Sequence, residues 1–291
     1  MKDEERIELS IVMPVYNEFE SVDGVIDSIR ESGTRSSYEI VAVDDASTDG
    51  SSDILSRRAD AGDIRLIRHQ ENQGYGAALK TGIREARSGT VMIIDGDGSY
   101  PASHFDEFIS YGSEYDMVVG ARGSGVMEEP LLRTWVKSFI LRLLRFLGDM
   151  QVPDLNSGLR LMKRDQVMRY FHLLPDGISF TSTITLVLLS EGARVKYVPI
   201  DYFARAGSSK VRPFRDTLGM LTLILRTFLY FNPLKVFLPL SLVLLVVALL
   251  VGFGSIAAGK FMDVTTVVFL LSAVQVFVLG LLADLIAKRR S

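Results

Sequence analysis

Residues 90–98 read Thr90-Val91-Met92-Ile93-Ile94-Asp95-Gly96-Asp97-Gly98, an apolar run that passes directly into two aspartates separated by one glycine. An apolar run of this length that ends in Asp and Gly is typical of a buried strand followed by a turn. We therefore predict a strand over Thr90–Ile94, with Asp95 and Asp97 at its carboxyl end. The two aspartates are either ordinary turn residues or ligands of a hard divalent cation, which prefers oxygen.

The sequence before this stretch alternates short apolar runs with segments of helical period. Strands that alternate with helices of about 10 to 15 residues predict βαβ units and a Rossmann-like α/β fold with a mainly parallel sheet. The expected strands are Ile7–Pro14, Tyr38–Val43 and Ile64–Arg68, and the expected helices are Glu20–Ser32, Thr48–Ala61 and Gly74–Arg87.

Polar residues cluster where three of the predicted strands end, at Tyr16-Asn17-Glu18, Asp44-Asp45 and Asp95-Gly96-Asp97. Because ligands of parallel sheets bind beyond the carboxyl ends of the strands, we expect these residues to form one acidic rim. Asp45 is expected to accept hydrogen bonds from a nucleobase or ribose, and Ser47 or Thr48 to cap the next helix. Exposed N–H groups of Asn72–Gly76 are expected to help place a nucleotide, unless this is a plain glycine-rich loop.

Two segments near the C-terminus are long and apolar enough to cross a bilayer. Pro233–Ala258 carries only the charge of Lys235, and Val264–Ala287 only that of Asp284. Each has about 24 residues, or ~36 Å of helix, against a hydrocarbon core of ~30 Å. Only residues 259–263 separate them, which predicts an antiparallel hairpin; two buried helices of a soluble protein are the alternative.

Basic residues flank both outer ends of this hairpin, namely Arg226, Lys235, Lys288, Arg289 and Arg290. The positive-inside rule then predicts a multi-pass membrane protein whose large N-terminal part lies on the cytoplasmic face. We expect a catalytic domain over residues 1–212, an interfacial amphipathic helix over 213–232 and the hairpin over 233–291, with spans at about 233–258 and 264–287. A second basic amphipathic stretch, 131–147, suits either the membrane interface or a protein surface.

Composition narrows the possible functions. The net charge of −3 does not suit a polyanion binder, so no nucleic-acid partner is expected. The absence of cysteine excludes disulfides, thiolate metal ligands and a cysteine nucleophile. The histidines His69, His104 and His172 lack the spacing of metal ligands, and none is expected to be catalytic.

Basic residues also accumulate before the hairpin. Such a run suits phosphate binding, because arginine and lysine suppress charge repulsion and arginine offers bidentate contacts. Attraction to anionic lipid headgroups explains the same run. From Lys196 to Lys235 there are seven basic residues, Lys196, Arg205, Lys210, Arg212, Arg215, Arg226 and Lys235, against Asp201 and Asp216.

Several motifs occur in an order and spacing that resembles a known family. They are VMPVYNE (12–18), VDDASTDG (43–50), NQGYG (72–76), DGD (95–97), GAR (120–122), DLNSGLR (154–160) and RAGSSK (205–210). Together, over residues 7 to about 235, they resemble the inverting glycosyltransferases of GT-A fold, in particular the polyprenyl-phosphate (dolichyl-phosphate) hexose synthases. The hairpin that follows suits the same branch.

The resemblance implies a role for individual residues. Two positions depart from the family pattern: relatives often carry glutamine at Ser99 as a further metal ligand, and glutamate at Thr183. Asp154, Ser157 and Ser99 are further candidates for the site. The resemblance implies a nucleotide-sugar pocket formed by Pro14, Tyr16, Glu18, Asp45 and Asp95, and a Mg²⁺ or Mn²⁺ site formed by Asp95 and Asp97. It implies that the donor diphosphate and the acceptor phosphate are bound by Arg122, Arg133, Arg205 and Lys210. The residues expected to be catalytic are Asp97, Arg122, Arg205 and Lys210.

The expected reaction moves a hexose from a UDP- or GDP-sugar to an undecaprenyl or dolichyl phosphate, with inversion by single displacement. A phosphate acceptor is already anionic and needs no general base, whereas a hydroxyl acceptor does. Two alternatives remain: a transferase acting on a hydroxyl of a lipid or glycan, with Asp154 as base, and a catalytically silent membrane subunit. The lipid bilayer is an expected partner, and a homo-oligomer is expected by analogy.

Overall fold

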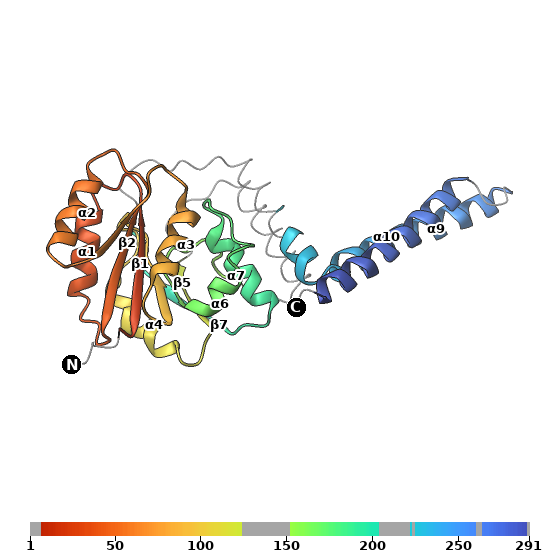
Figure 1. Cartoon of the computed structure of the whole chain (residues 1–291). Coiled ribbons are helices and arrows are strands. Elements are labelled where there is room, and N and C mark those ends of the chain that lie inside the picture. Colours follow the sequence, from red (N-terminus) through yellow and green to blue (C-terminus); the bar gives the residue numbers. More distant parts are fainter. Residues whose placement is uncertain (1–6, 124–151, 204–221, 223–224, 260–263, 290–291) are drawn as a thin grey trace. The chain divides into compact units, whose positions relative to one another are not determined.

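The computed structural model describes residues 7–123, 152–203, 222, 225–259 and 264–289. These residues fall into two compact units, one containing the described residues up to 203 and the other those from 222 onward (Figure 1). The predicted amphipathic stretch 131–147 and most of the predicted interfacial helix lie outside the described residues, although 225–231 are helical.

The first unit is built on one seven-stranded sheet with the order β3-β2-β1-β4-β6-β5-β7. Strands β3, β2, β1 and β4 run parallel to one another, and β5 runs parallel to β7. Only β6 is antiparallel, to both β4 and β5, which confirms the predicted mainly parallel sheet. The strands are β1 Leu9–Val15, β2 Tyr38–Asp44, β3 Arg65–Arg68, β4 Thr90–Ile93, β5 Met117–Arg122, β6 Arg160–Lys163 and β7 Val195–Ile200.

Helices cover both faces of this sheet, as Figure 1 shows. The buried apolar side chains accordingly form two separate clusters. Residues of α1, α2 and α4 belong to one cluster, and residues of α3, α6 and α7 to the other. The helices are α1 Val22–Glu31, α2 Ser51–Asp60, α3 Tyr75–Glu85, α4 Phe105–Tyr111, α6 Arg164–Arg169 and α7 Phe180–Ser190, with a 3₁₀ turn, η1, at Ala102–His104.

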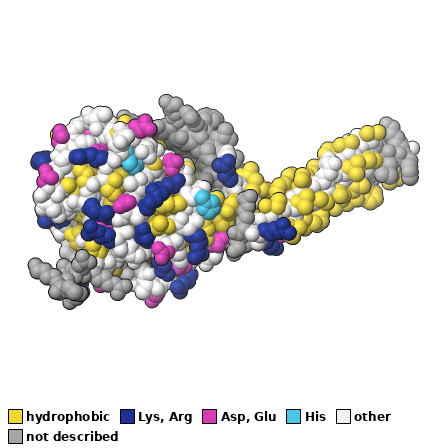
Figure 2. All heavy atoms as spheres, viewed as in Figure 1, with side chains coloured by type: hydrophobic (Ala, Val, Ile, Leu, Met, Phe, Trp, Pro, Cys, Tyr) yellow, Lys and Arg dark blue, Asp and Glu magenta, His cyan; other side chains and the backbone are white. Residues whose placement is uncertain are grey.

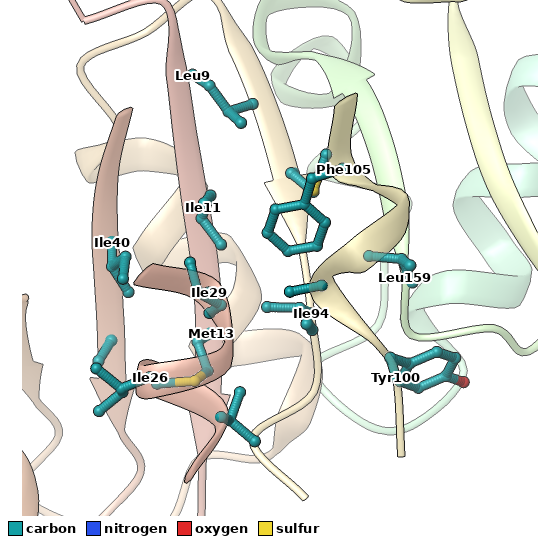
Figure 3. Close-up of a cluster of buried hydrophobic side chains, with 14 of the residues drawn as sticks. Leu9, Ile11, Met13, Ile26, Ile29, Ile40, Ile94, Tyr100, Phe105 and Leu159 are labelled. Atoms are coloured by element: carbon teal, nitrogen blue, oxygen red, sulfur yellow. The ribbon is translucent and has the colours of Figure 1, made fainter. Parts of the chain in front are cut away.

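Side chains alternate between the two faces along β1, so this one strand contributes residues to both clusters. Successive side chains of a strand point to opposite faces, so Leu9, Ile11 and Met13 pack towards α1, where Ile26 and Ile29 meet them (Figure 3). Val12 instead belongs to the cluster on the α3 side. Because both faces are covered, the strand reads as a nearly continuous apolar run.

The start of α2 differs from the sequence prediction. Neither Ser47 nor Thr48 caps this helix, because the helix begins at Ser51 and its N-cap residue is Gly50, with a left-handed φ of 96°. The Asp49 carboxylate accepts a hydrogen bond from the Ser51 N–H at 3.0 Å. The residues before Gly50 are used in a loop at the end of β2, so the helix starts later than its sequence pattern suggests.

The second unit is a hairpin of α9 (Leu234–Ala257) and α10 (Val264–Lys288). Their mean hydropathies of 2.9 and 2.4 suit membrane spans, as predicted. Small residues bring the two helices close together: a Cβ on Gly280 would lie 2.6 Å from Cβ of Phe237, and one on Gly252 would lie 3.1 Å from Thr266. Hydrophobic side chains cover the visible face of the hairpin (Figure 2).

Gly82 marks the closest approach of α3 to the sheet. A Cβ at this position would lie 2.3 Å from Cγ1 of Val12 and 3.2 Å from Cγ2 of Val43. Both valines are fully buried in the parallel strands β1 and β2. Only a residue without a side chain therefore lets α3 lie at this distance from the sheet.

We predict that Gly82→Ala lowers the free energy of unfolding by about 1–3 kcal/mol through overpacking. Gly24 in α1 is the matched control, since a Cβ there would meet nothing within 4 Å. Gly24→Ala should leave stability unchanged or raise it by ~0.5–1 kcal/mol. Thermal unfolding of the full chain in detergent measures both, and equal unfolding temperatures for the two variants would contradict the close approach.

Candidate functional site

The acidic rim predicted at the strand ends is present. Strands β2, β1 and β4 are neighbours and run parallel, so their carboxyl ends meet at one edge of the sheet. Backbone contacts hold the loops together: the Asp45 N–H donates to the Val15 carbonyl at 2.9 Å. The Ser21 hydroxyl donates to the Gly96 carbonyl, also at 2.9 Å. Residues from three distant parts of the sequence therefore form one site.

Two of the rim residues adopt a strained backbone. Asn17 and Ala46 have positive φ angles of 57° and 61°, which residues other than glycine rarely adopt. The strain of roughly 1–2 kcal/mol per residue is held by bonds between the loops. The Ser47 hydroxyl accepts from the Asn17 N–H at 3.1 Å, and the Asn17 side-chain carbonyl accepts from the Thr48 N–H at 2.8 Å. Such strain is concentrated at functional sites.

Asp45 is buried and is surrounded by donors of the chain itself. Its carboxylate accepts hydrogen bonds from the N–H groups of Gln73 and Gly74, at 2.9 and 2.8 Å. Nδ1 of His69 lies 2.6 Å from Oδ1 of Asp45, and its Nε2 lies 3.0 Å from the Thr81 hydroxyl. The expectation that exposed N–H groups of Asn72–Gly76 face a nucleotide is therefore wrong for Gln73 and Gly74. Asp45 fixes the loop that opens α3.

His69 is a residue that sequence reasoning missed. Its spacing in the chain gives no signal, but it follows β3 directly, and β3 pairs with β2, whose end carries Asp45. His69 and Asp45 are thus brought together by sheet order. The side chain of His69 is only 7% exposed, so it acts as a fixed part of the rim.

Asp95 is oriented by a tyrosine and by a glycine. The Tyr75 hydroxyl, on the first residue of α3, donates to Oδ1 of Asp95 at 2.7 Å. Burial and the nearby charge of Asp95 raise the pKa of Tyr75, so the phenol stays a donor at neutral pH. A Cβ on Gly158 would lie 2.0 Å from Oδ2 of Asp95, so only glycine fits there. Tyr75 was also missed, because a tyrosine in a glycine-rich loop carries no signature of its own.

Asp97 is nearly buried, with 8% of its surface exposed. Its Oδ1 accepts hydrogen bonds from the Ser99 N–H, at 3.0 Å, and from the Ser99 hydroxyl. Ser99 therefore serves as a donor that orients Asp97, in the position where relatives were expected to carry a metal ligand. The other departure, Thr183, is buried in α7 and donates to the Ser179 carbonyl at 2.7 Å.

Arg122 and Asp154 form a bidentate ion pair. Nε and Nη2 of Arg122 donate to the two carboxylate oxygens of Asp154 at 2.7 and 2.9 Å. The guanidinium also lies 5.2 Å from the centre of the Tyr202 ring. Although burial alone would raise the pKa of Asp154, the bonds from Arg122 lower it below its ordinary value. Asp154 is therefore a poor general base at neutral pH.

A second arginine, Arg160, holds the loop that contains Asp154. Arg160 is fully buried and donates to the carbonyls of Ser157 and Leu155, at 2.8 and 2.7 Å, and to the Thr185 hydroxyl. The Gly158 N–H donates to the Tyr100 hydroxyl at 2.7 Å. Ser157 is itself buried. These hydrogen bonds fix the loop 154–158. In the run DLNSGLR, Arg160 therefore binds the loop carbonyls, and Gly158 leaves room for Asp95.

The remaining candidates differ in accessibility. Pro14 is a buried residue of β1, and its carbonyl oxygen would lie 3.3 Å from a Cβ on Gly96. Tyr16 is 40% exposed, whereas Glu18 is partly buried. Arg133, Arg205 and Lys210 lie outside the described residues. Among the residues that the structure describes, no group of three or more His, Asp or Glu could hold a metal ion.

Two family models match the chain. The model described as Glycosyl transferase family 2 matches residues 10–171, and the one described as GtrB C-terminal hairpin matches residues 232–288. The first covers the rim and the sheet as far as β6, and the second covers the hairpin.

Curated relatives align along most of both chains. A dolichyl-phosphate hexose transferase of Haloferax volcanii is 30% identical over 209 residues, which are 71% of this chain and 88% of that protein. A dolichyl-phosphate beta-glucosyltransferase of Saccharomyces cerevisiae is 24% identical and covers 71% and 70%. An undecaprenyl-phosphate 4-deoxy-4-formamido-L-arabinose transferase of Yersinia pestis is 28% identical and covers 96% and 88%.

Solved structures share the fold. Glucosyl-3-phosphoglycerate synthase of Mycobacterium tuberculosis, in complex with phosphoglyceric acid, matches with a TM-score of 0.57 and 21% identity, over 76% of this chain and 79% of that one. The same synthase in complex with Mn²⁺, uridine diphosphate and glucosyl-3-phosphoglycerate matches with a TM-score of 0.54 and 21% identity, over 76% and 78%.

We predict that Asp154→Asn lowers the unfolding temperature at pH 7, because it leaves a partly buried guanidinium without its charge partner. The expected loss is about 1–3 kcal/mol. Since the pKa of Asp154 is lowered in the folded chain, its contribution is complete above the ordinary Asp value of 3.8 and is lost as the pH falls below it. The difference between wild type and variant should therefore close below about pH 4.

The control for this experiment is Asp165→Asn. Asp165 is 94% exposed and lies 3.9 Å from Arg164, so its loss should change stability by less than ~0.5 kcal/mol at every pH. A wild-type advantage over Asp154→Asn that persists undiminished at pH 2.5 would disprove the ion-pair account.

Proposed function

Because this chain belongs to glycosyl transferase family 2, we propose that it transfers a hexose from a UDP- or GDP-linked sugar to a polyprenyl phosphate. It is a glycosyltransferase of GT-A fold with a C-terminal apolar hairpin. The observation that carries the choice of acceptor is the alignment with transferases named for dolichyl and undecaprenyl phosphate, one of which covers 96% of this chain. That alignment extends over both the catalytic unit and the hairpin.

The donor is proposed to lie over the rim, with the nucleotide beside Tyr16, Glu18 and Asp45. Asp95 and Asp97 suit a Mg²⁺ or Mn²⁺ ion, which commonly takes one or two protein carboxylates together with substrate phosphate oxygens. Tyr75 and Ser99 hold these carboxylates in fixed orientations. A bound cation would neutralise negative charge on the departing nucleoside diphosphate. The synthase of similar fold that was solved with Mn²⁺ and uridine diphosphate supports this assignment.

The acceptor phosphate is proposed to bind at Arg122, together with Arg133, Arg205 and Lys210. Arg122 uses Nε and Nη2 to bind Asp154, while its Nη1 makes no hydrogen bond with the described residues and is available to a phosphate oxygen. An oxygen of the acceptor attacks the anomeric carbon as the bond to the donor diphosphate breaks. The nucleoside diphosphate leaves with the electron pair, and a single displacement inverts the configuration.

The state of Asp154 favours a phosphate acceptor over a hydroxyl acceptor. A hydroxyl must lose its proton to a base whose pKa lies near the working pH. Both oxygens of Asp154 are bound by Arg122 and its pKa is lowered, so it does not suit that role. A phosphate carries its own negative charge and needs only cations around it. We place the reaction on the cytoplasmic face, from the basic residues that flank the hairpin.

The reaction is tested with the full chain in lipid vesicles that contain polyprenyl phosphate. With Mg²⁺ or Mn²⁺ and a panel of labelled UDP- and GDP-hexoses, one donor should label the organic-solvent extract and release nucleoside diphosphate. Asp97→Ala should lower this transfer at least ~100-fold, as expected for loss of charge stabilisation, whereas the exposed-site variant Asp165→Asn keeps it. Label that appears only when a hydroxyl acceptor is supplied would disprove the proposed acceptor.

Tyr75 provides a separate test of the metal site. Tyr75→Phe removes the phenol that orients Asp95, a hydrogen bond worth ~1 kcal/mol. The metal concentration for half-maximal transfer should then rise by about 5-fold, while the rate at saturating metal changes little. Tyr115→Phe is the control, since Tyr115 packs against Tyr111 away from the rim. The same metal dependence in Tyr75→Phe and wild type would refute the positioning role.

A further inference from the structure

Asn156 is an exposed residue of the loop that precedes β6. Its backbone is fixed, since its N–H donates to Oδ1 of Asp154 at 3.0 Å. Its side chain is fixed as well, because Oδ1 of Asn156 accepts a hydrogen bond from the Ser182 hydroxyl of α7. Ordering an exposed polar side chain costs conformational entropy. The chain thus holds this amide in one orientation at the surface.

Ser182 differs from the hydroxyl residues that follow it in α7. The hydroxyls of Thr183 and Thr185 each donate to the carbonyl four residues earlier, at 2.7 and 2.8 Å. Hydroxyl side chains within helices commonly make this local bond. Ser182 instead directs its hydroxyl out of the helix to Asn156, and only 3% of its own surface is exposed. The hydrogen bond between α7 and the loop is therefore anchored in the interior.

This hydrogen bond decides which end of the amide faces outward. A carboxamide has one oxygen that accepts and one NH₂ group that donates two hydrogen bonds. Because the Asn156 oxygen is held by Ser182, the outward end is Nδ2. Nδ2 makes no hydrogen bond with the described residues. Asn156 consequently presents N–H donors to a ligand that lies beside the loop.

The loop places these donors between two parts of the site. Two residues before Asn156, Asp154 binds Arg122 with both carboxylate oxygens. Two residues after it, Gly158 lies so close to Asp95 that there is no room for a Cβ. Two residues of chain span at most ~7 Å, so Asn156 is near both. In the proposed function Asp95 faces the donor diphosphate and Arg122 the acceptor phosphate, and the hexose passes between them.

We propose that Asn156 donates a hydrogen bond to a hydroxyl of the hexose, and that Ser182 is its positioning residue. This inference rests on the proposed function, because it requires a nucleotide-sugar at the rim. A neutral amide suits a sugar hydroxyl, whereas arginine and lysine suit the phosphates on either side. A site that hydrogen-bonds a substrate hydroxyl discriminates against sugars in which that hydroxyl is missing or misplaced. Asn156 is therefore a residue that selects the hexose.

The test compares the binding of a nucleotide-sugar with the binding of its bare nucleoside diphosphate. The full chain in detergent, with Mn²⁺ and without acceptor, is titrated with UDP-glucose, UDP-galactose, GDP-mannose, UDP and GDP. Asn156→Ala should weaken binding of the nucleotide-sugar that wild type prefers by about 5-fold, as expected for one lost hydrogen bond, and leave its bare diphosphate within about 2-fold. Ser182→Ala should weaken the same nucleotide-sugar by about 3-fold. Ser190→Ala, at the other end of α7, is the matched control and should change neither affinity.

Transfer to polyprenyl phosphate is measured in parallel, so that the two proposals can fail separately. If wild type transfers the hexose but Asn156→Ala binds the nucleotide-sugar as tightly as wild type, the role of Asn156 is overturned and the proposed function stands. An equal loss for the nucleotide-sugar and the bare diphosphate, or a raised KM for polyprenyl phosphate alone, would also overturn it. An unchanged affinity in Ser182→Ala would overturn the positioning role. If wild type neither binds nor transfers a UDP- or GDP-hexose, the proposed function itself is wrong.

Discussion

The site depends on how its carboxylates are held. Asp45, Asp95 and Asp97 come from neighbouring strand ends, and like charges gathered at one edge repel each other. The chain meets this repulsion with its own donors: backbone N–H groups for Asp45, the Tyr75 phenol for Asp95 and Ser99 for Asp97. These bonds also tie the loops to one another. The carboxylates therefore shape the loops of the rim, and the loops in turn keep the carboxylates in place.

The close contacts beneath the rim also follow from the need to hold its carboxylates in place. Asp95 can lie against the loop after residue 154 only because Gly158 has no side chain. The inner side of that loop is held by hydrogen bonds to its backbone carbonyls. Arg160 fixes it by donating to backbone carbonyls, although burial lowers the pKa of this arginine and so opposes its charge. Arg122 is thereby held beside the rim through Asp154, where it remains partly exposed.

The parts of this arrangement that are periodic or local could be predicted from the sequence. The strand that ends at Ile93, the parallel sheet and the shared edge of Asp45 and Asp95 follow from apolar runs and the alternation with helices. The start of α2 was predicted too early, because Asp49 and Gly50 end a loop whose path depends on contacts with Asn17. Tyr75 and Arg160 lie within motifs that the sequence shows, but their roles could not be assigned, and His69 gave no signal. Each of the three acts through a contact, with a residue at least five positions away, that only the fold creates.

In the hairpin, too, the sequence pattern predicts the elements, while packing decides which of their side chains make contacts. Length and hydropathy predict two spans, but they treat every residue on the surface of a helix alike. Only packing distinguishes the sides of α10, because Thr266, Ala273 and Gly280 are covered by α9 and the opposite side is not. The spacing of these small residues, and not hydropathy, therefore decides which side of α10 packs against α9.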